Sequence, residues 1–180
     1  MKVRGGVKMT RYEYGGDEFI FVELSEEMSL EVNFKAMAIT NRLKEERLPG
    51  IIDICPSNSS YMIRFDPDRT HPNDLISKLR ELEESVSSDD IEISSRVVDV
   101  PILFDDPWTH EALMRFRDRH QDPSSTDLEY AARINGFKSK EDLIKAITDF
   151  PFIVSMIGFV PGLPWCYQMV PREQQIEVPK

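Results

Sequence analysis

Two amphipathic helical segments, each flanked by short β-rich segments, restrict the fold of this chain more than any other feature. Apolar residues recur at helical spacing over 29–47 and again over 72–87. Around these segments, β-branched and aromatic residues concentrate in four short runs, at 18–24, 50–56, 60–66 and 96–103. The predicted order of elements is therefore strand, helix, strand, strand, helix, strand.

This order is typical of a ferredoxin-like α+β domain, in which both helices cover one face of a small, mostly antiparallel sheet. We expect the domain to span residues 16–96. The polar segment before it, residues 1–15, is expected to be loose because it carries no apolar periodicity.

The second half of the chain has a different pattern. Thr126 stands three residues before Glu129, which is the spacing of a capping box at the start of a helix. Three helices are expected, followed by one strand, at 107–119, 126–135, 139–149 and 151–157. This half has too few strands to close a sheet on its own.

The composition is that of a globular chain and disfavours some classes of function. Of the 180 residues, 41% are hydrophobic and 30% are charged, and the formal net charge is −10. Because an acidic surface repels phosphate backbones, we expect no binding to nucleic acid. The N-terminus lacks the apolar core of a secretory signal, and no apolar run is long enough for a membrane span. We therefore predict a cytoplasmic protein that makes no membrane contact.

Cysteine and histidine are the first candidates for chemistry. Cys55 and Cys166 lie in apolar contexts and form no CxxC pair, so we interpret them as reduced, partly buried thiols. His110 and His120 could bind a metal together with nearby aspartates, namely Asp105, Asp106 and Asp118. The HExxH spacing of zinc proteases is absent, and a solvated helix face is the simpler interpretation, so we expect no metal in this chain. The nucleotide-loop patterns GxxxxGK[ST] and GxGxxG are absent as well.

The segment GFVPGLPW, residues 158–165, is the least ordinary stretch of the chain. It combines two glycines and two prolines with large apolar side chains. Glycine permits positive φ and close approach, whereas proline fixes φ and removes a hydrogen-bond donor, so the loop has few conformations. One interpretation is a hydrophobic turn buried under its own domain. The other is a preorganised wall of a pocket or a subunit interface, and this second interpretation is the one we predict.

The same segment resembles the GF-x-PGFPYL signature of the carboxyltransferase subdomain C/D family, also called the allophanate hydrolase subunit 1 family. Further blocks resemble the family in the same order along the chain. These are Gly16-Asp17 before the first strand, Asn33 in the first helix, GIIDICPSNSSYMIRFDP at 50–67, VVDVPILFDD at 97–106 and GFKSKEDL at 136–143. Together they cover residues 16–172, and no single block is specific by itself.

The resemblance implies a second domain and a set of partners. Residues 97–180 would be the N-terminal, incomplete part of a cyclophilin-like β-barrel domain. The family includes the small subunit of bacterial 5-oxoprolinase and a region of urea carboxylase. It therefore implies a subunit of an ATP-dependent amidohydrolase or of a biotin-dependent carboxyltransferase, paired with a homologous cyclophilin-like protein of the subunit 2 type. ATP would act at the level of the complex, biotin would be carried by a partner domain, and the substrate would be a small amide, lactam or carboxylate.

The resemblance also implies roles for individual residues. The apolar wall of a substrate site or interface would comprise Phe159, Pro161, Pro164 and Trp165. The backbone N–H groups of Gly158 and Gly162 would donate to an oxyanion. Arg172 would bind a carboxylate, with a surface salt bridge as its alternative role. The catalytic residues themselves are not implied.

Three departures from the family pattern bear on the substrate. After the VVDVP strand, FDDPWTHEALMRFRDRHQDPSSTDL at 104–128 stands, with an insertion, where the family usually has the glycine-rich Y-G-G-x-x-GPDL. Leu163-Pro164-Trp165 replaces the usual F-P-Y, and Ile147 stands where the preceding helix usually carries histidine. These departures favour the urea-carboxylase branch over specificity for 5-oxoproline. A different class of function is implied by the KipI-like members of the family, which are non-catalytic inhibitors of a histidine kinase.

Overall fold

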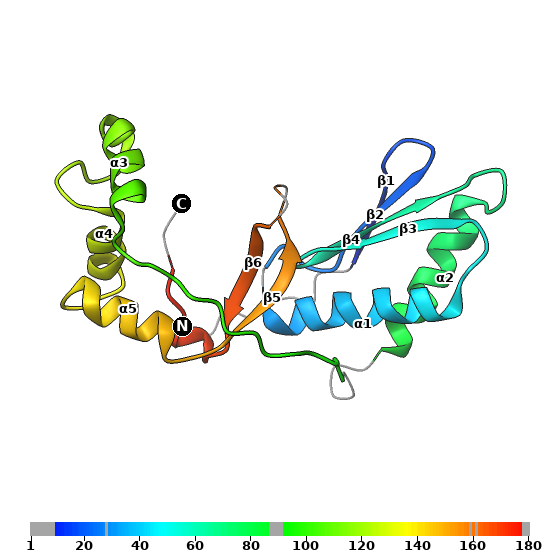
Figure 1. Ribbon diagram of the computed structural model, residues 1–180. Coiled ribbons are helices and arrows are strands. Elements are labelled where there is room, and N and C mark those ends of the chain that lie inside the picture. Colours follow the sequence, from blue (N-terminus) through cyan, green and yellow to red (C-terminus); the bar gives the residue numbers. More distant parts are fainter. Residues whose placement is uncertain (1–9, 28, 87–91, 159, 161, 178–180) are drawn as a thin grey trace, which may run out of the picture. The chain divides into compact units, whose positions relative to one another are not determined.

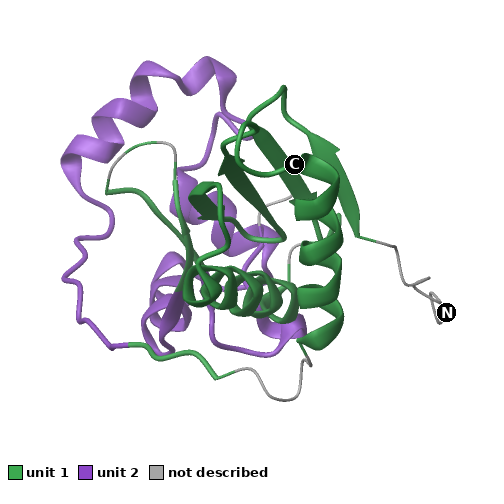
Figure 2. Cartoon of the chain, turned by 90° about the vertical axis from the view of Figure 1, so that its right-hand side faces the viewer, with its two compact units in different colours: residues 1–95, 154–166 green, residues 96–153, 167–180 purple. Residues whose placement is uncertain are grey.

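The computed structural model describes residues 10–177 with the exception of 28, 87–91, 159 and 161 (Figure 1). The chain forms two compact units (Figure 2). Residues 1–95 and 154–166 make up the first unit, and residues 96–153 and 167–180 make up the second. The border expected after residue 96 adjoins the border between the units, but 154–166, which we expected in the second domain, groups with the first unit.

A four-stranded antiparallel sheet forms the centre of the first unit (Figure 1). Its strands are β1 (Arg11–Tyr14), β2 (Phe19–Glu23), β3 (Ile51–Pro56) and β4 (Ser60–Phe65), in the order β1-β2-β4-β3. Side chains alternate between the two faces, as strand geometry requires. In the central pair, Ile20 lies opposite Ile63 and Val22 lies opposite Tyr61, and all four side chains are buried.

Helices α1 (Leu30–Glu46) and α2 (Pro72–Ser85) complete the core of this unit. The Ser29 hydroxyl caps α1 by accepting from the backbone N–H of Val32. The apolar stripes of both helices enter one cluster with the buried face of the sheet; from the helices it contains Ala36, Ile39, Leu43, Leu75, Leu79 and Leu82. Both helices therefore cover the same face of the sheet, as predicted.

The edge of the sheet beside β2 differs from the prediction. Residues 96–103, expected as the last strand, have no regular secondary structure, and β1 occupies this edge instead. The expectation of a loose segment was therefore wrong for 11–14. Because a tight turn at Gly15-Gly16 joins β1 to β2, their pairing closes a very short loop, whereas 96–103 would have to return from beyond α2. The fold is a mixed α/β fold with antiparallel sheets.

Residues 96–103, which do not form the edge strand, are exposed. Their large apolar side chains face solvent, with Val97 at 89% exposure and Leu103 at 67%. The others of this kind are Val98, Val100 and Ile102. Residues 96–103 thus belong to the second unit without being part of a core.

The second unit is mainly helical in its described part. It contains α3 (Pro107–Arg115), α4 (Asp127–Ile134), α5 (Lys140–Thr148) and short 3-10 turns at Arg117–Arg119 and Arg172–Gln174. The capping box predicted at Thr126 and Glu129 is present in full. The predicted helix at 107–119 is shorter than expected, because its last turn tightens into a 3-10 turn.

Strands β5 (Phe152–Ile157) and β6 (Pro164–Gln168) pair as a two-stranded sheet, and the chain passes from the second unit to the first and back along them. Among the helices of the described residues, none combines the length and the apolar character that a membrane crossing demands.

Glu83 on α2 holds β1 against the helices of the first unit. Its carboxylate accepts from the Tyr12 hydroxyl at 2.6 Å, from Lys35 Nζ at 2.8 Å and from the Thr10 hydroxyl. Burial alone would raise the pKa of Glu83, but the hydrogen bonds from Lys35, Thr10 and Tyr12 outweigh burial and lower it. The Tyr12 pKa is raised, by burial and then by the bond to Glu83.

Replacing Glu83 by Gln should lower the stability of the protein at neutral pH and flatten its loss in acid. Because the folded-state pKa of Glu83 is depressed, its contribution is complete above the unfolded value of about 4.3 and disappears as the pH falls through the folded value. Urea midpoints between pH 7 and pH 3 would measure this effect. Glu84→Gln, an exposed change on the same helix, is the matched control. Equal acid slopes for wild type and Glu83→Gln would contradict the role of this network.

Candidate functional site

The turn between β5 and β6 carries most of the residues singled out from the sequence. Gly158 N donates to the Leu163 carbonyl at 2.7 Å, and Leu163 N donates to the Val160 carbonyl at 3.0 Å. Gly162 has φ +86°, in the region that favours glycine. The turn is therefore closed by its own backbone bonds. Two predicted site residues, Phe159 and Pro161, lie outside the described residues.

The structure gives one predicted donor of this turn another partner. The Gly158 N–H was expected to donate to an oxyanion, but it is already used in the short bond to the Leu163 carbonyl. It cannot serve a ligand without opening the turn. Gly162 remains the candidate donor, and its role stays a prediction.

Gly158 is required by the close approach of its neighbours. A Cβ atom at this position would lie 2.7 Å from Nε1 of Trp165 and 2.8 Å from the Leu163 carbonyl oxygen. The indole thus lies directly against the glycine backbone. Even so, Trp165 is 48% exposed, and Leu163 and Val160 are 44% and 47% exposed. These three apolar side chains are about half exposed, which does not fit a turn buried under its own domain.

A buried polar cluster fixes the base of this hairpin. The side-chain amide of Asn33, on α1, donates to the carbonyls of Ser57 at 3.2 Å and of Ser155 at 3.3 Å. The Ser155 hydroxyl lies within hydrogen-bonding distance of Asn58 Oδ1 and of the Trp165 carbonyl. Asn33 is fully buried, and its Oδ1 has no partner among the described atoms. These bonds join α1, the β3–β4 turn and the hairpin within the first unit.

Replacing Asn33 by Ala should destabilise the protein by about 1–3 kcal/mol, because two buried carbonyls lose their donor. Asn33→Asp should be at least as harmful, since an ionised carboxylate cannot donate and would face the same carbonyls. Urea unfolding measures both effects, and hydrogen exchange at 154–157 reports whether the hairpin loosens. Asn41→Ala, at an exposed position on the same helix, serves as control. A loss below about 0.5 kcal/mol for Asn33→Ala would show that the cluster is not an anchor.

Replacing Gly158 by Ala should disrupt the turn. The new methyl group would meet the indole of Trp165 and, more rigidly, the backbone oxygen of Leu163. We expect a loss of stability of about 1–3 kcal/mol and a shift in Trp165 fluorescence, measured in a Trp108→Phe background. Gly162→Ala is the comparison, because it adds backbone strain but meets no atom within 4 Å. Unchanged Trp165 emission in Gly158→Ala would contradict the close contact.

The two cysteines were expected to be partly buried, and this expectation was wrong. Cys55 and Cys166 are both exposed. Cys55 lies on the edge strand β3, and Cys166 lies on β6 of a two-stranded sheet, so neither strand is covered as a central strand would be. Residual desolvation raises the pKa of both thiols, and the charge of Asp53 raises that of Cys55 further. Raised thiol pKa values do not fit an activated nucleophile.

Three of the five residues considered for a metal site, His120, Asp106 and Asp105, have other partners. His120 Nε2 lies 2.9 Å from Asp127 Oδ1, and its Nδ1 accepts from the backbone N–H of Asp122. Asp106 caps α3, and Asp105 pairs with Lys140. No group of three or more potential metal ligands occurs among the residues that the structure describes.

Arg172 forms a surface salt bridge, which was the alternative role considered for it. Its guanidinium pairs with Glu177 at 2.6 Å and donates to Gln175 Oε1 at 3.0 Å, and both charged side chains are exposed. Arg172 also belongs to the second unit, whereas the turn at 158–165 belongs to the first. Binding of a carboxylate by Arg172 stays a prediction, and would require this ion pair to open.

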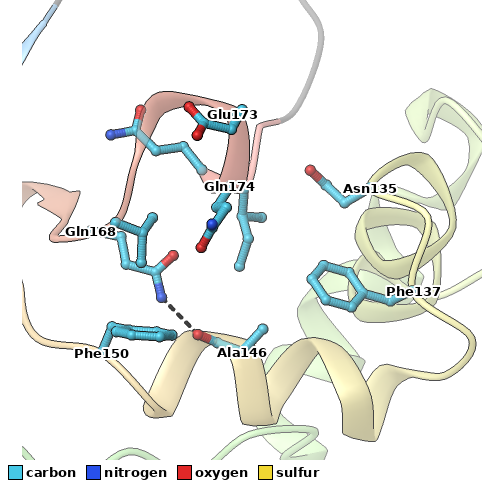
Figure 3. Close-up of a pocket in the computed structure, with 10 residues that line it drawn as sticks. Asn135, Phe137, Ala146, Phe150, Gln168, Glu173 and Gln174 are labelled. Carbon is cyan, nitrogen blue, oxygen red and sulfur yellow. Dashed lines mark hydrogen bonds between the residues drawn. The ribbon is translucent and has the colours of Figure 1, made fainter.

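The second unit contains a pocket that the sequence analysis missed (Figure 3). It has a volume of about 340 Å³ and is lined by three separate segments of the chain. Its lining residues are Asn135, Phe137, Ala146, Phe150, Gln168, Val170, Glu173, Gln174, Gln175 and Ile176. The one signal in the sequence was the concentration of carboxamides at 168–175, which has no characteristic spacing.

Hydrogen bonds hold the walls of this pocket in place. Gln168 is buried, and its Nε2 donates to the carbonyl of Ala146 on α5 at 2.6 Å (Figure 3). Asn135, at the end of α4, donates to the carbonyl of Glu177 and accepts from its N–H, both at 2.9 Å. The segment after β6 is thereby tied to both helices, so that the pocket has a defined polar lining.

Solved structures share this fold. The crystal structure of the Kluyveromyces lactis urea carboxylase matches with a TM-score of 0.68 and 21% identity, over 88% of this chain and 14% of that chain. The K. lactis urea amidolyase structure matches with a TM-score of 0.66 and 20% identity, over 88% of this chain and 10% of that chain. The chain therefore has the mixed α/β fold found in part of these larger proteins.

Sequence comparison identifies the family. The family model "Carboxyltransferase domain, subdomain C and D" matches residues 10–180. One of the 5-oxoprolinase subunits of Bacillus subtilis is 26% identical over 87% of this chain and 62% of its own length. The urea amidolyase of Saccharomyces cerevisiae is 22% identical over 91% of this chain and 9% of its own length. The chain belongs to the carboxyltransferase subdomain C and D family, which confirms the resemblance drawn from its motifs, and it spans less than two thirds of these relatives.

Proposed function

We propose that the chain is one part of an enzyme that either hydrolyses or carboxylates a small amide or lactam. The reaction would be ATP-dependent hydrolysis, as the name of the 5-oxoprolinase relative suggests, or carboxyl transfer, as the carboxyltransferase family suggests. A homologous cyclophilin-like subunit or domain would complete the site. ATP would be bound by a partner domain, since the sequence has neither nucleotide-loop pattern. Biotin would be carried by a partner domain.

The observation that carries this proposal is the exposed apolar turn at 158–165 on a rigid base. Three of its apolar side chains are 44–48% exposed, yet its backbone is closed by internal bonds and held by the Asn33 cluster. A surface that is already ordered loses little conformational entropy when it binds. Such a turn suits contact with a partner subunit or with a substrate bound beside it.

In the proposed enzyme, the turn would also assist the chemistry. Both amide hydrolysis and carboxyl transfer place developing negative charge on an oxygen atom, and a fixed backbone N–H stabilises such charge. Gly162 is the glycine of the turn whose N–H could act in this way, because that of Gly158 is occupied. Trp165 and Pro164 would exclude water from the reacting groups.

A non-catalytic function is the second candidate, and one observation favours it. The exposed apolar side chains of the turn, Val160, Leu163 and Trp165, fit contact with a protein partner as well as with a substrate. In that case the turn would be a protein-binding surface, as in the kinase-inhibitor members of the family.

Replacing Trp165 by Ala should weaken assembly with the cyclophilin-like partner by at least about tenfold in Kd while the melting temperature moves little. A half-exposed indole contributes more to a partner surface than to the fold. The measurement is co-purification and titration calorimetry of the complete gene product with the homologous partner, together with ATP-dependent amide turnover by the complex. Trp108→Ala on α3, where the indole is 71% exposed, is the matched control.

Two outcomes would contradict the proposal. A loss of about 3–5 kcal/mol of stability in Trp165→Ala would show that the indole is part of a core. Normal assembly and turnover in this variant would show that the turn is not the binding surface. Assembly with a histidine kinase, without amide turnover, would favour the inhibitor function.

A further inference from the structure

Asn135 and Gly136, at the end of α4, form the one Asn-Gly pair of the sequence. In such a pair the backbone nitrogen that follows the asparagine can attack the side-chain amide carbon, because glycine has no Cβ to hinder the approach. Asparagine is counted among the thermolabile residues of proteins. Gly136 also has room to rearrange, since a Cβ atom added there would meet nothing within 4 Å. The pair therefore has the local chemistry of a modification site.

The reaction at this pair is deamidation through a cyclic imide. The Gly136 nitrogen loses its proton to solvent hydroxide and forms a bond to Cγ of Asn135. The Cγ–Nδ2 bond breaks, and the nitrogen takes up a proton from water and leaves as ammonia. Water then opens the ring at one of its two carbonyl carbons, which gives aspartate or isoaspartate. The net reaction consumes one water and releases one ammonia, so water is the only co-reactant.

The folded structure holds both reacting groups in hydrogen bonds. Nδ2 of Asn135, the leaving nitrogen, donates to the carbonyls of Ala131 and Glu177, both at 2.9 Å. The attacking nitrogen of Gly136 donates to the Arg133 carbonyl at 3.1 Å. Ring closure would break the bond from Gly136 and turn the side chain of Asn135 away from its partners. The pair is therefore protected while these bonds persist.

Part of this protection comes from the segment after β6. Besides accepting from Nδ2, Glu177 donates its backbone N–H to Oδ1 of Asn135 at 2.9 Å. Residues 175–177 have no regular secondary structure, and the ion pair of Glu177 with Arg172 is exposed, so it adds little to their docking. If this segment leaves, the bond to Ala131 is the one that remains among the side-chain bonds described for Asn135.

We infer that Asn135–Gly136 is a site of spontaneous deamidation, which docking of residues 175–177 keeps closed and release of this segment opens. The product makes the release permanent. An ionised carboxylate at position 135 cannot donate to the carbonyls of Ala131 and Glu177, and its charge lies at the C-terminal end of α4, where the helix dipole disfavours it.

This modification would change the pocket of the second unit. Asn135 lines that pocket (Figure 3), and so do residues 175 and 176 of the released segment. Deamidation would therefore detach one of its walls. The inference does not depend on the proposed enzyme activity, because it follows from the bonds of Asn135 alone.

The test is the rate of deamidation at Asn135 in the whole chain, followed by peptide mapping that separates the asparagine, aspartate and isoaspartate forms. Native protein and protein unfolded in guanidinium are incubated in parallel at the same pH and temperature. We expect the native chain to react at least about tenfold more slowly, because several hydrogen bonds must open first. Asn58, which precedes a serine, is the internal reference and should react more slowly than Asn135 in the unfolded chain.

Variants at position 177 separate docking of the segment from general stability. Glu177→Pro removes the N–H that donates to Asn135 and should raise the native rate at least about fivefold, roughly the factor of one hydrogen bond. Glu177→Ala keeps the backbone groups and loses only the ion pair with Arg172, so it is the matched control and should change the rate less than about twofold. Asn135→Asp, the product itself, should speed hydrogen exchange at the Glu177 N–H at least about fivefold.

Three results would overturn the inference: equal rates in native and unfolded chain, equal rates in the two position-177 variants, or unchanged exchange at Glu177 in Asn135→Asp. If Glu177→Pro does not fold, the wild-type rate in urea below the unfolding transition decides. A rate that rises with urea before global unfolding supports release of 175–177 as the opening step. A rate that rises only with global unfolding refutes it.

Discussion

The amide of Asn33 links parts of the first unit that are 122 positions apart in the chain. Its two donated bonds connect α1 to the β3–β4 turn and to the middle of β5. Without them, the carbonyls of Ser57 and Ser155 would lose this donor, and the hairpin at 158–165 would lose its link to α1. An isolated two-stranded hairpin is marginal in water, so the shape of the exposed turn depends on this buried side chain.

The elements that depend on local pattern could be predicted from the sequence. The stripes of α1 and α2 and the alternation in β2 and β4 each specify which side faces the core. The capping box at Thr126 likewise depends on residues only three positions apart. The edge of the sheet could not be predicted in this way, because 11–14 and 96–103 both suit a strand. The choice between them depends on loop length and on the bonds of Tyr12 and Tyr14 to α2.

In the candidate site, too, some features follow from local sequence pattern and others only from the tertiary structure. The rigidity of the turn follows from its glycines and prolines. The hydrogen bond from the Gly158 N–H to the Leu163 carbonyl, by contrast, depends on the three-dimensional structure of the turn. The pocket of the second unit was missed because its walls come from three segments, around Asn135, Ala146 and Gln168. The family motif identifies the turn as a candidate site, whereas the pocket is identified by its lining residues.

The exposed apolar segment at 96–103 also affects how the chain behaves in a crowded solution. A run of β-branched side chains without a core favours edge-to-edge polymerisation with other chains. Two residues inside the run oppose this outcome. Asp99 adds like charge between neighbouring copies, and Pro101 interrupts the row of N–H groups that a growing cross-β stack would require. Both residues therefore limit the stacking of this exposed segment on copies of itself.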